Sequence, residues 1–314
     1  MKPDLIVICG PTASGKTALA VALAQALNGE VVSADSMQVY RRMDIGTAKP
    51  TAEEMAGVPH HMIDVADPEE NYSVARYVQE AVPVVDDILA RGRLPIVAGG
   101  TGLYIDNLIA GREFAPFPAD TGLRESLQAR AKAGGLPALR EELARVDPEA
   151  ARRLHPNDEK RIIRALEVWY ATGKTITEHD RESRALPPRY TALTIGLDYA
   201  DRADLRERID RRVDEMMDRG LEAEVRALLD SGVSPGCTAM QAIGYKELAA
   251  ALAEGRPAEE GAEEIKLRSR QYAKRQLTWF RRNRDVRWFR WGSSPDFSQA
   301  LAFSTETAAR CGLQ

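Results

Sequence analysis

The chain has 314 residues, of which 44% are hydrophobic and 29% are charged, and its net charge is −4. These values are ordinary for a globular protein with a large core, and the length allows two domains. The average charge gives no sign of a polyanionic partner, so such a partner would need a local basic patch. The three cysteines lie far apart without a C-x-x-C pair, so they predict neither a zinc site nor a disulfide framework and fit a reducing compartment.

The sequence does not predict a membrane protein. No stretch approaches the ~18 apolar residues that a membrane span needs. The apolar run near the N-terminus has only five residues, 5–9, which is too short for a signal peptide. We therefore expect a soluble cytoplasmic protein with no membrane partner. Nothing requires more than one copy, so we expect a monomer.

The first predicted elements are a strand at 5–9, a phosphate-binding loop and a helix over 18–27. In such a loop the backbone N–H groups and the helix N-terminus bind anions, Lys16 binds terminal phosphates, and the Thr17 hydroxyl helps to hold Mg²⁺. A glycine-rich turn with a chance lysine is the alternative, which the flanking strand and helix disfavour. We therefore expect a ligand with at least two linked phosphates. The loop fits G-x-x-x-x-G-K-[ST] at every fixed position, with the residues Gly10, Pro11, Thr12, Ala13, Ser14, Gly15, Lys16 and Thr17.

A second predicted strand, 30–33, runs directly into Asp35. Ligands of an open parallel sheet bind beyond the carboxyl ends of its strands, so Asp35 is expected beside the phosphate loop. A general base or a metal-bound carboxylate would act there; an Asp that only caps the next turn is the alternative. The polar residues 39–50 predict a loop that faces the substrate.

The next segments predict a helix, a strand and a second glycine-rich turn. His60 and His61 are adjacent with no third ligand nearby, so hydrogen-bonding roles are favoured over a metal site. Residues 73–91 predict a helix that Pro83 should bend or interrupt. A strand over 94–98 then ends in 99–104 (GGTGLY), where Thr101 could donate to a phosphate oxygen; a tight turn without a ligand is the alternative. No Asp follows this strand, which argues against a motor-type ATPase.

From about residue 112 no strand pattern occurs until 190–197, which predicts a helical insertion between two strands of one sheet. Within the insertion, Lys160 and Arg161 lie on one predicted helix, whose default interpretation is a solvated charged face. Residues 202–229 then predict a long helix or a pair of helices broken at a glycine. Arg208 and Arg212 share a face there and would form a pyrophosphate clamp if that face overlooks the phosphate loop; a surface pair is the alternative.

The C-terminal third holds a strongly basic stretch, 266–290, with ten Lys or Arg residues against one acid. Several aromatic residues are interleaved with these charges, a combination that favours single-stranded nucleic acid. A charged helix followed by an edge strand with buried aromatics is the alternative. We expect both, with Trp288 or Trp291 partly structural and the basic face exposed.

Taken in order, these segments resemble the bacterial tRNA dimethylallyltransferases, also called tRNA isopentenyltransferases. The resemblance runs from about residue 5 to about residue 290, and the ordered set is far more specific than any one segment. The segments are 10–17 (GPTASGKT), 35–40 (DSMQVY), 46–50 (GTAKP), 59–61 (PHH), 99–104 (GGTGLY), 243–248 (IGYKEL) and 272–280 (YAKRQLTWF).

The resemblance implies an α/β fold, with a P-loop NTPase-like parallel sheet core flanked by helices and a helical insertion domain. Residues 1–111 and 190–314 would form the catalytic core and a basic tRNA-binding region, and residues 112–189 would form the insertion, which would contact tRNA. The implied reaction moves a dimethylallyl group from dimethylallyl diphosphate to N6 of the adenosine on the 3′ side of the anticodon. The target tRNAs would be those that read codons beginning with U.

The resemblance also implies roles for individual residues. Asp35 would accept the amine proton, while Lys16, Thr101 and Arg212 would stabilise the leaving diphosphate. The phosphate loop would bind the allylic diphosphate rather than ATP, with Mg²⁺ at Thr17. The residues expected to contact the tRNA anticodon stem-loop are Asp35, Ser36, Met37, Gln38, Thr101, Arg124, Lys160, Arg161, Lys274, Arg275, Gln276 and Thr278.

Three other functions stay open at this stage. A small-molecule kinase on the same fold would transfer phosphate from ATP and could use the insertion as a lid. A prenyltransferase acting on free adenine nucleotides would have no use for the basic stretch. A non-catalytic RNA-binding module would leave the phosphate loop and Asp35 without a role.

Overall fold

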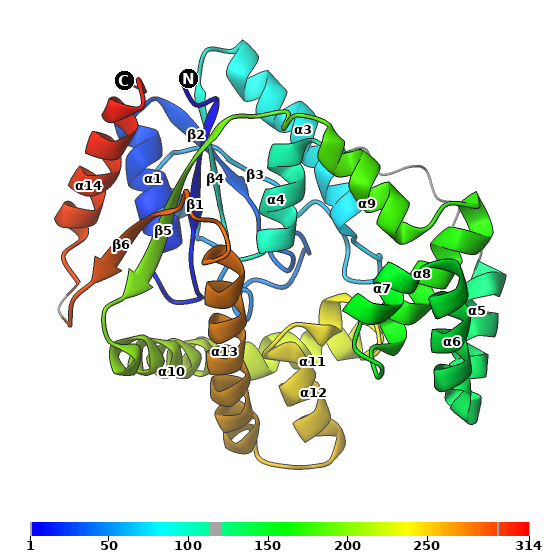
Figure 1. Ribbon diagram of the computed structural model, residues 1–314. Helices are drawn as coiled ribbons and strands as arrows, with labels where there is room; N and C mark the ends of the chain where they lie inside the picture. Colours follow the sequence, from blue (N-terminus) through cyan, green and yellow to red (C-terminus); the bar gives the residue numbers. More distant parts are fainter. Residues whose placement is uncertain (1, 113–120, 294, 314) are drawn as a thin grey trace. The chain divides into compact units, whose positions relative to one another are not determined.

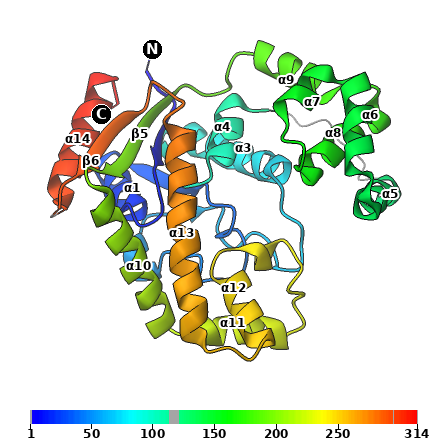
Figure 2. The ribbon, with the colours of Figure 1, turned by 60° about the horizontal axis from the view of Figure 1, so that its bottom comes forward.

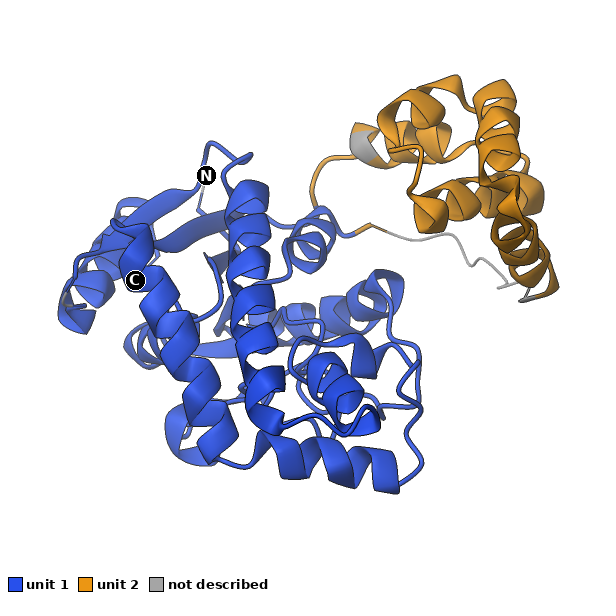
Figure 3. Ribbon diagram, turned by 90° about the horizontal axis from the view of Figure 1, so that it is seen from below, with its two compact units in different colours: residues 1–111, 189–314 blue, residues 112–188 orange. Residues whose placement is uncertain are grey.

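The computed structural model describes residues 2–112, 121–293 and 295–313 (Figure 1). The chain divides into two compact units, one of residues 1–111 and 189–314 and the other of residues 112–188 (Figure 3). Within the described residues no helix is both long and apolar enough to cross a membrane.

The larger unit is built on a six-stranded sheet in which every pairing is parallel, in the order β3-β2-β4-β1-β5-β6. This confirms the predicted α/β class. β1 lies inside the sheet, with Val7 opposite Val97 on one side and Thr194 on the other, and all five of its residues are buried. The strands are β1 Leu5–Cys9, β2 Gly29–Ser33, β3 His60–His61, β4 Leu94–Gly99, β5 Ala192–Tyr199 and β6 Arg287–Trp291.

Helices cover both faces of this sheet (Figure 1). Apolar side chains of α3 and α4 join the core on one face, and those of α1, α10 and α14 join the core on the other. The helices of this unit are α1 Lys16–Ala26, α2 Ala52–Met55, α3 Val74–Ala90, α4 Gly102–Ala110, α10 Arg202–Asp218, α11 Leu221–Asp230, α12 Tyr245–Ala253, α13 Ala258–Phe280 and α14 Phe297–Arg310.

Pro83 was predicted to bend or interrupt this helix, and the interruption is wrong, because α3 continues through Pro83 as one helix. Proline removes one backbone donor and crowds the preceding turn, which destabilises an isolated helix. Here Tyr77, Val85 and Ile88 are fully buried on either side of it. Their burial against the sheet holds the helix together across the proline.

The carboxyl ends of β1, β2 and β4 bring three loops to one edge of the sheet. The phosphate loop follows β1, residues 34–50 follow β2, and a glycine-rich turn follows β4. The last two approach closely: a Cβ on Gly99 would lie 2.2 Å from the carbonyl oxygen of Ala34, so this position requires glycine. The Thr101 N–H donates to that same oxygen over 3.2 Å.

Over its described residues, 112 and 121–188, the smaller unit contains helices and no strand, as predicted for the insertion. It has its own core, in which Leu139, Leu143, Ile162 and Leu166 are fully buried. Asp147 is buried and accepts hydrogen bonds from the N–H of Ala150 and from the backbone and hydroxyl of Thr177. The helices are α5 Thr121–Arg130, α6 Leu136–Val146, α7 Pro148–Arg153, α8 Glu159–Thr172 and α9 Ile176–Ala185, and the chain kinks between α5 and α6, where Gly134 has φ +83°.

Candidate active site

The phosphate loop adopts a conformation that only its glycines allow at two positions. Gly10 has φ +148°, and a Cβ there would lie 2.4 Å from the carbonyl oxygen of Leu197; Gly15 has φ +83° at the start of α1. Lys16 folds back over the loop, and its Nζ donates to the carbonyl of Pro11 over 2.6 Å. Burial, assisted by the nearby guanidinium of Arg212, lowers the pKa of Lys16 to about 8.

Two side chains from the C-terminal third brace this loop. Gln276 on α13 accepts the Thr12 N–H over 2.9 Å and donates to the Gly100 carbonyl over 3.0 Å. Trp291 on β6 donates from Nε1 to the Ser14 carbonyl over 3.0 Å. Trp291 is therefore structural, as one of the two tryptophans was expected to be. Both ends of the buried Gln276 amide have partners inside the protein, and its predicted contact with tRNA stays a prediction.

Asp35 lies at the predicted position beyond β2 and lines the same cavity as the phosphate loop. Its Oδ1 accepts the N–H groups of Met37 over 2.9 Å and Gln38 over 3.4 Å, so it also caps the following turn. Among the described residues none donates a hydrogen bond to Oδ2. Asp35 interacts electrostatically with Lys16 and Arg212, which places its negative charge within reach of both cations.

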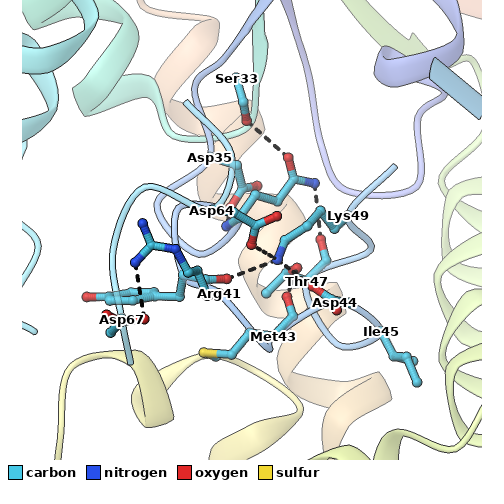
Figure 4. A network of polar contacts seen from close by, with 12 residues as sticks. Ser33, Asp35, Arg41, Met43, Asp44, Ile45, Thr47, Lys49, Asp64 and Asp67 are labelled. Carbon is cyan, nitrogen blue, oxygen red and sulfur yellow. Dashed lines mark hydrogen bonds and ion pairs between the residues drawn. The ribbon is translucent and has the colours of Figure 1, made fainter. Parts of the chain in front are cut away.

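The neighbours of Asp35 are held from two directions. The Thr101 hydroxyl accepts the N–H of Ser36 over 3.1 Å, which joins the turn after β4 to the segment after β2. The Gln38 amide donates to the carbonyls of Thr47 and Ala48 over 3.2 and 3.1 Å and accepts from Ser33 Oγ (Figure 4). In the structure the Gln38 amide organises the loop, and Gln38 also lines the cavity. The predicted contact of Gln38 with tRNA stays a prediction.

Arg208 and Arg212 come from the face of α10 that lines this cavity, together with the phosphate loop. Burial lowers the pKa of Arg212, which Asp35 partly offsets. Two buried polar atoms here, Arg208 Nε and Ser14 Oγ, have no hydrogen-bond partner among the described residues. Unpaired buried donors beside a nest of backbone N–H groups are suited to an anion with several oxygens.

These groups share one cavity of about 630 Å³. The phosphate loop forms one part of its wall, Asp35 and its neighbours form another, and α10 and α13 contribute cationic and aromatic side chains. Burial raises the pKa of the lining Tyr272 to about 12, so this phenol stays neutral. No group of three or more His, Cys, Asp or Glu within the described residues could hold a metal ion.

The basic stretch 266–290 carries less unpaired positive charge than its composition suggests. α13 runs alongside α10 (Figure 2), and acids elsewhere neutralise part of its charge. Lys266 pairs with Asp214 over 2.7 Å and Arg270 pairs with Asp210 over 2.6 Å. Arg281 likewise pairs with a buried aspartate of β5 over 2.9 Å.

Other predicted tRNA contacts stay exposed on α13. Lys274 and Thr278 are exposed, and the Thr278 hydroxyl donates to the carbonyl of Lys274 over 2.9 Å. Arg275 lies over the Tyr272 ring at 5.5 Å and lines the cavity. Together with the Tyr272 ring, these three side chains offer a basic, partly aromatic surface beside the candidate site.

The insertion residues differ in their surroundings. Lys160 and Arg161 are exposed on α8, and Arg161 forms an ion pair of 3.5 Å with Asp158. Arg124 is bound through two nitrogens to the buried carboxylate of Glu167, which raises the pKa of Arg124. A tRNA contact by Arg124 would therefore have to use guanidinium N–H groups that do not bind Glu167.

The paired histidines make hydrogen bonds, in line with the interpretation from the sequence. His61 Nε2 lies 2.8 Å from a carboxylate oxygen of buried Glu30, and His60 Nδ1 lies 2.9 Å from the Val58 carbonyl. Both contacts belong to the packing around β3.

Sequence reasoning missed Glu224 on α11. Its carboxylate accepts the N–H groups of Asp44, Ile45 and Gly46 over 3.0, 2.9 and 3.2 Å and the Tyr245 hydroxyl over 2.5 Å. It therefore holds the loop whose residues 46–48 line the cavity. Tyr245 lies in the segment 243–248 that carried the resemblance, but no local pattern pointed to Glu224.

Comparison with known proteins gives consistent results. A family model described as IPP transferase matches residues 38–283. The chain is 49% identical over 290 residues to the tRNA dimethylallyltransferase of Caldanaerobacter subterraneus, covering 92% of both chains. It is also 49% identical over 302 residues to that of Geobacter sulfurreducens, covering 96% of both.

Solved structures agree with the sequence relatives. The full-length tRNA isopentenylpyrophosphate transferase of Bacillus halodurans matches with a TM-score of 0.73 and 44% identity, covering 99% of this chain and 98% of that one. A eukaryotic dimethylallyltransferase acting on tRNA matches with a TM-score of 0.79 and 30% identity, covering 98% of this chain and 79% of that one.

Proposed function

Because the chain belongs to the IPP transferase family, we propose that it transfers the dimethylallyl group of dimethylallyl diphosphate to a tRNA. The acceptor is N6 of the adenosine on the 3′ side of the anticodon, in tRNAs that read codons beginning with U. The observation that carries the proposal is the single cavity of about 630 Å³ that joins the phosphate loop to Asp35. One end suits a diphosphate and the other suits the removal of a proton from an amine.

The diphosphate would bind to the loop N–H groups, Lys16 and the face of α10. The unpaired Ser14 Oγ and Arg208 Nε would then find oxygen acceptors, and Arg212 would add a second cation. Mg²⁺ fits this donor set, because it commonly takes few protein ligands together with phosphate oxygens and water; Thr17 would hold it, and it would neutralise charge on the leaving diphosphate. Such preorganised donors typically contribute about 10²–10³ each in rate.

The acceptor amine needs help because its lone pair is delocalised into the adenine ring. As the new N6–carbon bond forms, the bond from the allylic carbon to the diphosphate oxygen breaks and its electron pair leaves with the diphosphate. The amine then loses one proton. Asp35 Oδ2 is suited to accept it, since only Oδ1 is used in capping the turn.

The RNA would be bound mainly by basic side chains. Lys274, Arg275 and Thr278 on α13 would contact phosphates and bases near the cavity, and Lys160 and Arg161 on α8 would contact the RNA elsewhere. The target base must leave the anticodon loop to enter the cavity, which costs a few kcal/mol, and these contacts would offset that cost.

A competition assay tests the proposal against its rivals. The protein is incubated with labelled dimethylallyl diphosphate, an unmodified anticodon stem-loop RNA, AMP and ATP. We expect label in the RNA, at the adenosine next to the anticodon, with one diphosphate released per transfer. Label in AMP would identify a prenyltransferase of free nucleotides, and ATP turnover without prenylation would identify a kinase. RNA binding with neither reaction would leave a binding module.

A further inference from the structure

Lys49 is a buried lysine inside the loop that follows β2, with 6% of its side chain exposed. Its ammonium group makes three contacts (Figure 4): with the Tyr40 carbonyl over 3.0 Å, with Asp64 over 2.6 Å and with Asp44. An ammonium has three donors, and here each one has a partner. The charge is balanced locally by two carboxylates that are themselves half exposed.

These contacts add a buried ionic link between three parts of the chain that backbone hydrogen bonds and Glu224 also hold. Tyr40 lies near the start of the loop, Asp44 lies in its middle, and Asp64 follows β3. The backbone around them is unfavourable without such support, because Arg42, Ala48 and Asp64 have φ values of +65°, +47° and +56°. Residues in this left-handed region persist only where their surroundings hold them.

The loop held by Lys49 is connected to the proposed base. Gln38 binds the carbonyls of Thr47 and Ala48, immediately before Lys49, and the Gln38 N–H donates to Asp35. Asp64, which accepts from the Lys49 ammonium, donates its own N–H to the Gln38 carbonyl over 3.2 Å. Hydrogen bonds therefore connect the ammonium to Gln38 and, through the backbone of Gln38, to Asp35. The same loop supplies residues 46–48 to the cavity wall.

We propose that Lys49 is a positioning residue for the transfer reaction: its buried ammonium holds residues 35–49 in the shape that presents Asp35 to the acceptor amine. The effect on chemistry rests on the proposed function, whereas the effect on the loop does not. Lys49 does not line the cavity and acts only through the loop. Misplacing a reacting group by about 1 Å can reduce a rate on the order of 10²-fold.

The first test measures the loop without any substrate. Lys49→Met keeps the aliphatic stem and removes the ammonium, and Lys2→Met is the matched control, since exposed Lys2 precedes β1 at the opposite edge of the sheet. Trypsin cleavage after Arg41 and Arg42 is followed by mass spectrometry. The comparison is clean because Lys49 precedes Pro50, and trypsin does not cut such a bond even in the parent protein.

We expect cleavage at Arg41 and Arg42 to be faster in Lys49→Met by roughly 10- to 100-fold, the loss expected for hydrogen bonds to a charged group. Lys2→Met should be cut at the parent rate. Cleavage of Lys49→Met at the parent rate would overturn the proposal, because Lys49 would then not be holding the loop. This readout stands whether or not the protein prenylates RNA.

The second test measures chemistry, once the parent protein has been shown to prenylate the stem-loop. In single turnover at saturating substrates, Lys49→Met should transfer on the order of 10²-fold more slowly, with an unchanged Kd for a non-reactive diphosphate analogue. An unchanged transfer rate would overturn the positioning role. Failure of the parent itself to prenylate would count against the proposed function alone.

Asp64→Asn keeps the inference falsifiable if Lys49→Met does not fold. Asparagine tolerates the left-handed backbone at this position, so only the charge of one partner is removed. We expect faster cleavage at the same two arginines and a smaller loss of transfer rate. A fully folded Asp64→Asn variant with parent values in both assays would overturn the proposal.

Discussion

The Nε1 of Trp291 donates a hydrogen bond of 3.0 Å to the carbonyl oxygen of Ser14, 277 positions earlier in the chain. Ser14 lies in the phosphate loop, and Trp291 is the last residue of the edge strand β6. Trp291, which directly follows the basic stretch 266–290, therefore links that part of the chain to the phosphate loop.

Trp291→Phe should weaken diphosphate binding while leaving the fold intact. The smaller ring keeps much of the apolar contact but removes the donor to Ser14. One net hydrogen bond is worth about 0.5–1.5 kcal/mol, so we expect the Kd of dimethylallyl diphosphate to rise roughly 2- to 10-fold. Calorimetric titration measures this. Trp288→Phe, on the same strand, is the control and should bind as the parent does; equal weakening in both would assign the effect to the strand as a whole.

The two hydrogen bonds of the Gln276 side-chain amide can be tested separately. Gln276→Glu keeps an acceptor for the Thr12 N–H and loses the donor to Gly100, whereas Gln276→Leu loses both. We expect the Leu variant to lose more diphosphate affinity, because only there is the phosphate loop released. Kd values from titration measure this difference in affinity, and Tm values from thermal unfolding report whether both variants fold. A larger affinity loss in the Glu variant would contradict the assignment to Thr12.

The features that were predicted well from the sequence are formed by residues close together in the chain. The strand 5–9, the phosphate loop and the placement of Asp35 beyond the next strand follow from short patterns and from the rule for parallel sheets. Glu224 could not be found this way, because its partners Asp44, Ile45 and Gly46 lie about 180 positions away. Such contacts depend on how α11 packs against the loop.

Charge counts predicted the exposed cationic face of 266–290 but not its ion pairs. Eight of the ten Lys and Arg residues are exposed, whereas Lys266 and Arg270 are half-buried and pair with acids on α10. Gln38, a residue expected to contact RNA, has an amide that also closes its own loop. Polar side chains at a loop edge can serve either ligand or backbone, and composition does not distinguish these uses.

Asp35→Asn should remove the proposed base while preserving its shape. The side-chain oxygen of asparagine can still accept the N–H of Met37, so the turn is kept, but the amide cannot take up the proton. We expect the single-turnover transfer rate to fall about 10²–10⁴-fold with tRNA affinity within a few-fold. Filter binding and rapid-quench kinetics measure the two. Parallel loss of rate and affinity would make Asp35 a binding residue.

The pKa of Lys16 predicts how binding depends on pH. Burial lowers this pKa from 10.5 to about 8, so the cation is present below pH 8 and is lost as the pH rises through that value. Affinity for the diphosphate should therefore fall above about pH 8, with uptake of a proton on binding there. Titrations in buffers of different ionisation enthalpy measure the proton. Lys16→Arg, whose charge persists, should take up no proton in that range; a proton uptake equal to that of the parent would assign the titration to another group.

Replacing Lys274 and Arg275 by alanine should weaken tRNA binding and reduce its dependence on salt. Each phosphate contact with a single strand contributes about 0.7 to the slope of log K against log salt, so losing two contacts should lower the slope by about 1.4. Lys266→Ala is the control, because Lys266 is only 14% exposed and pairs with Asp214 and Glu263. Its slope should match that of the parent. A double variant with the parent slope would place the RNA phosphates away from this face of α13.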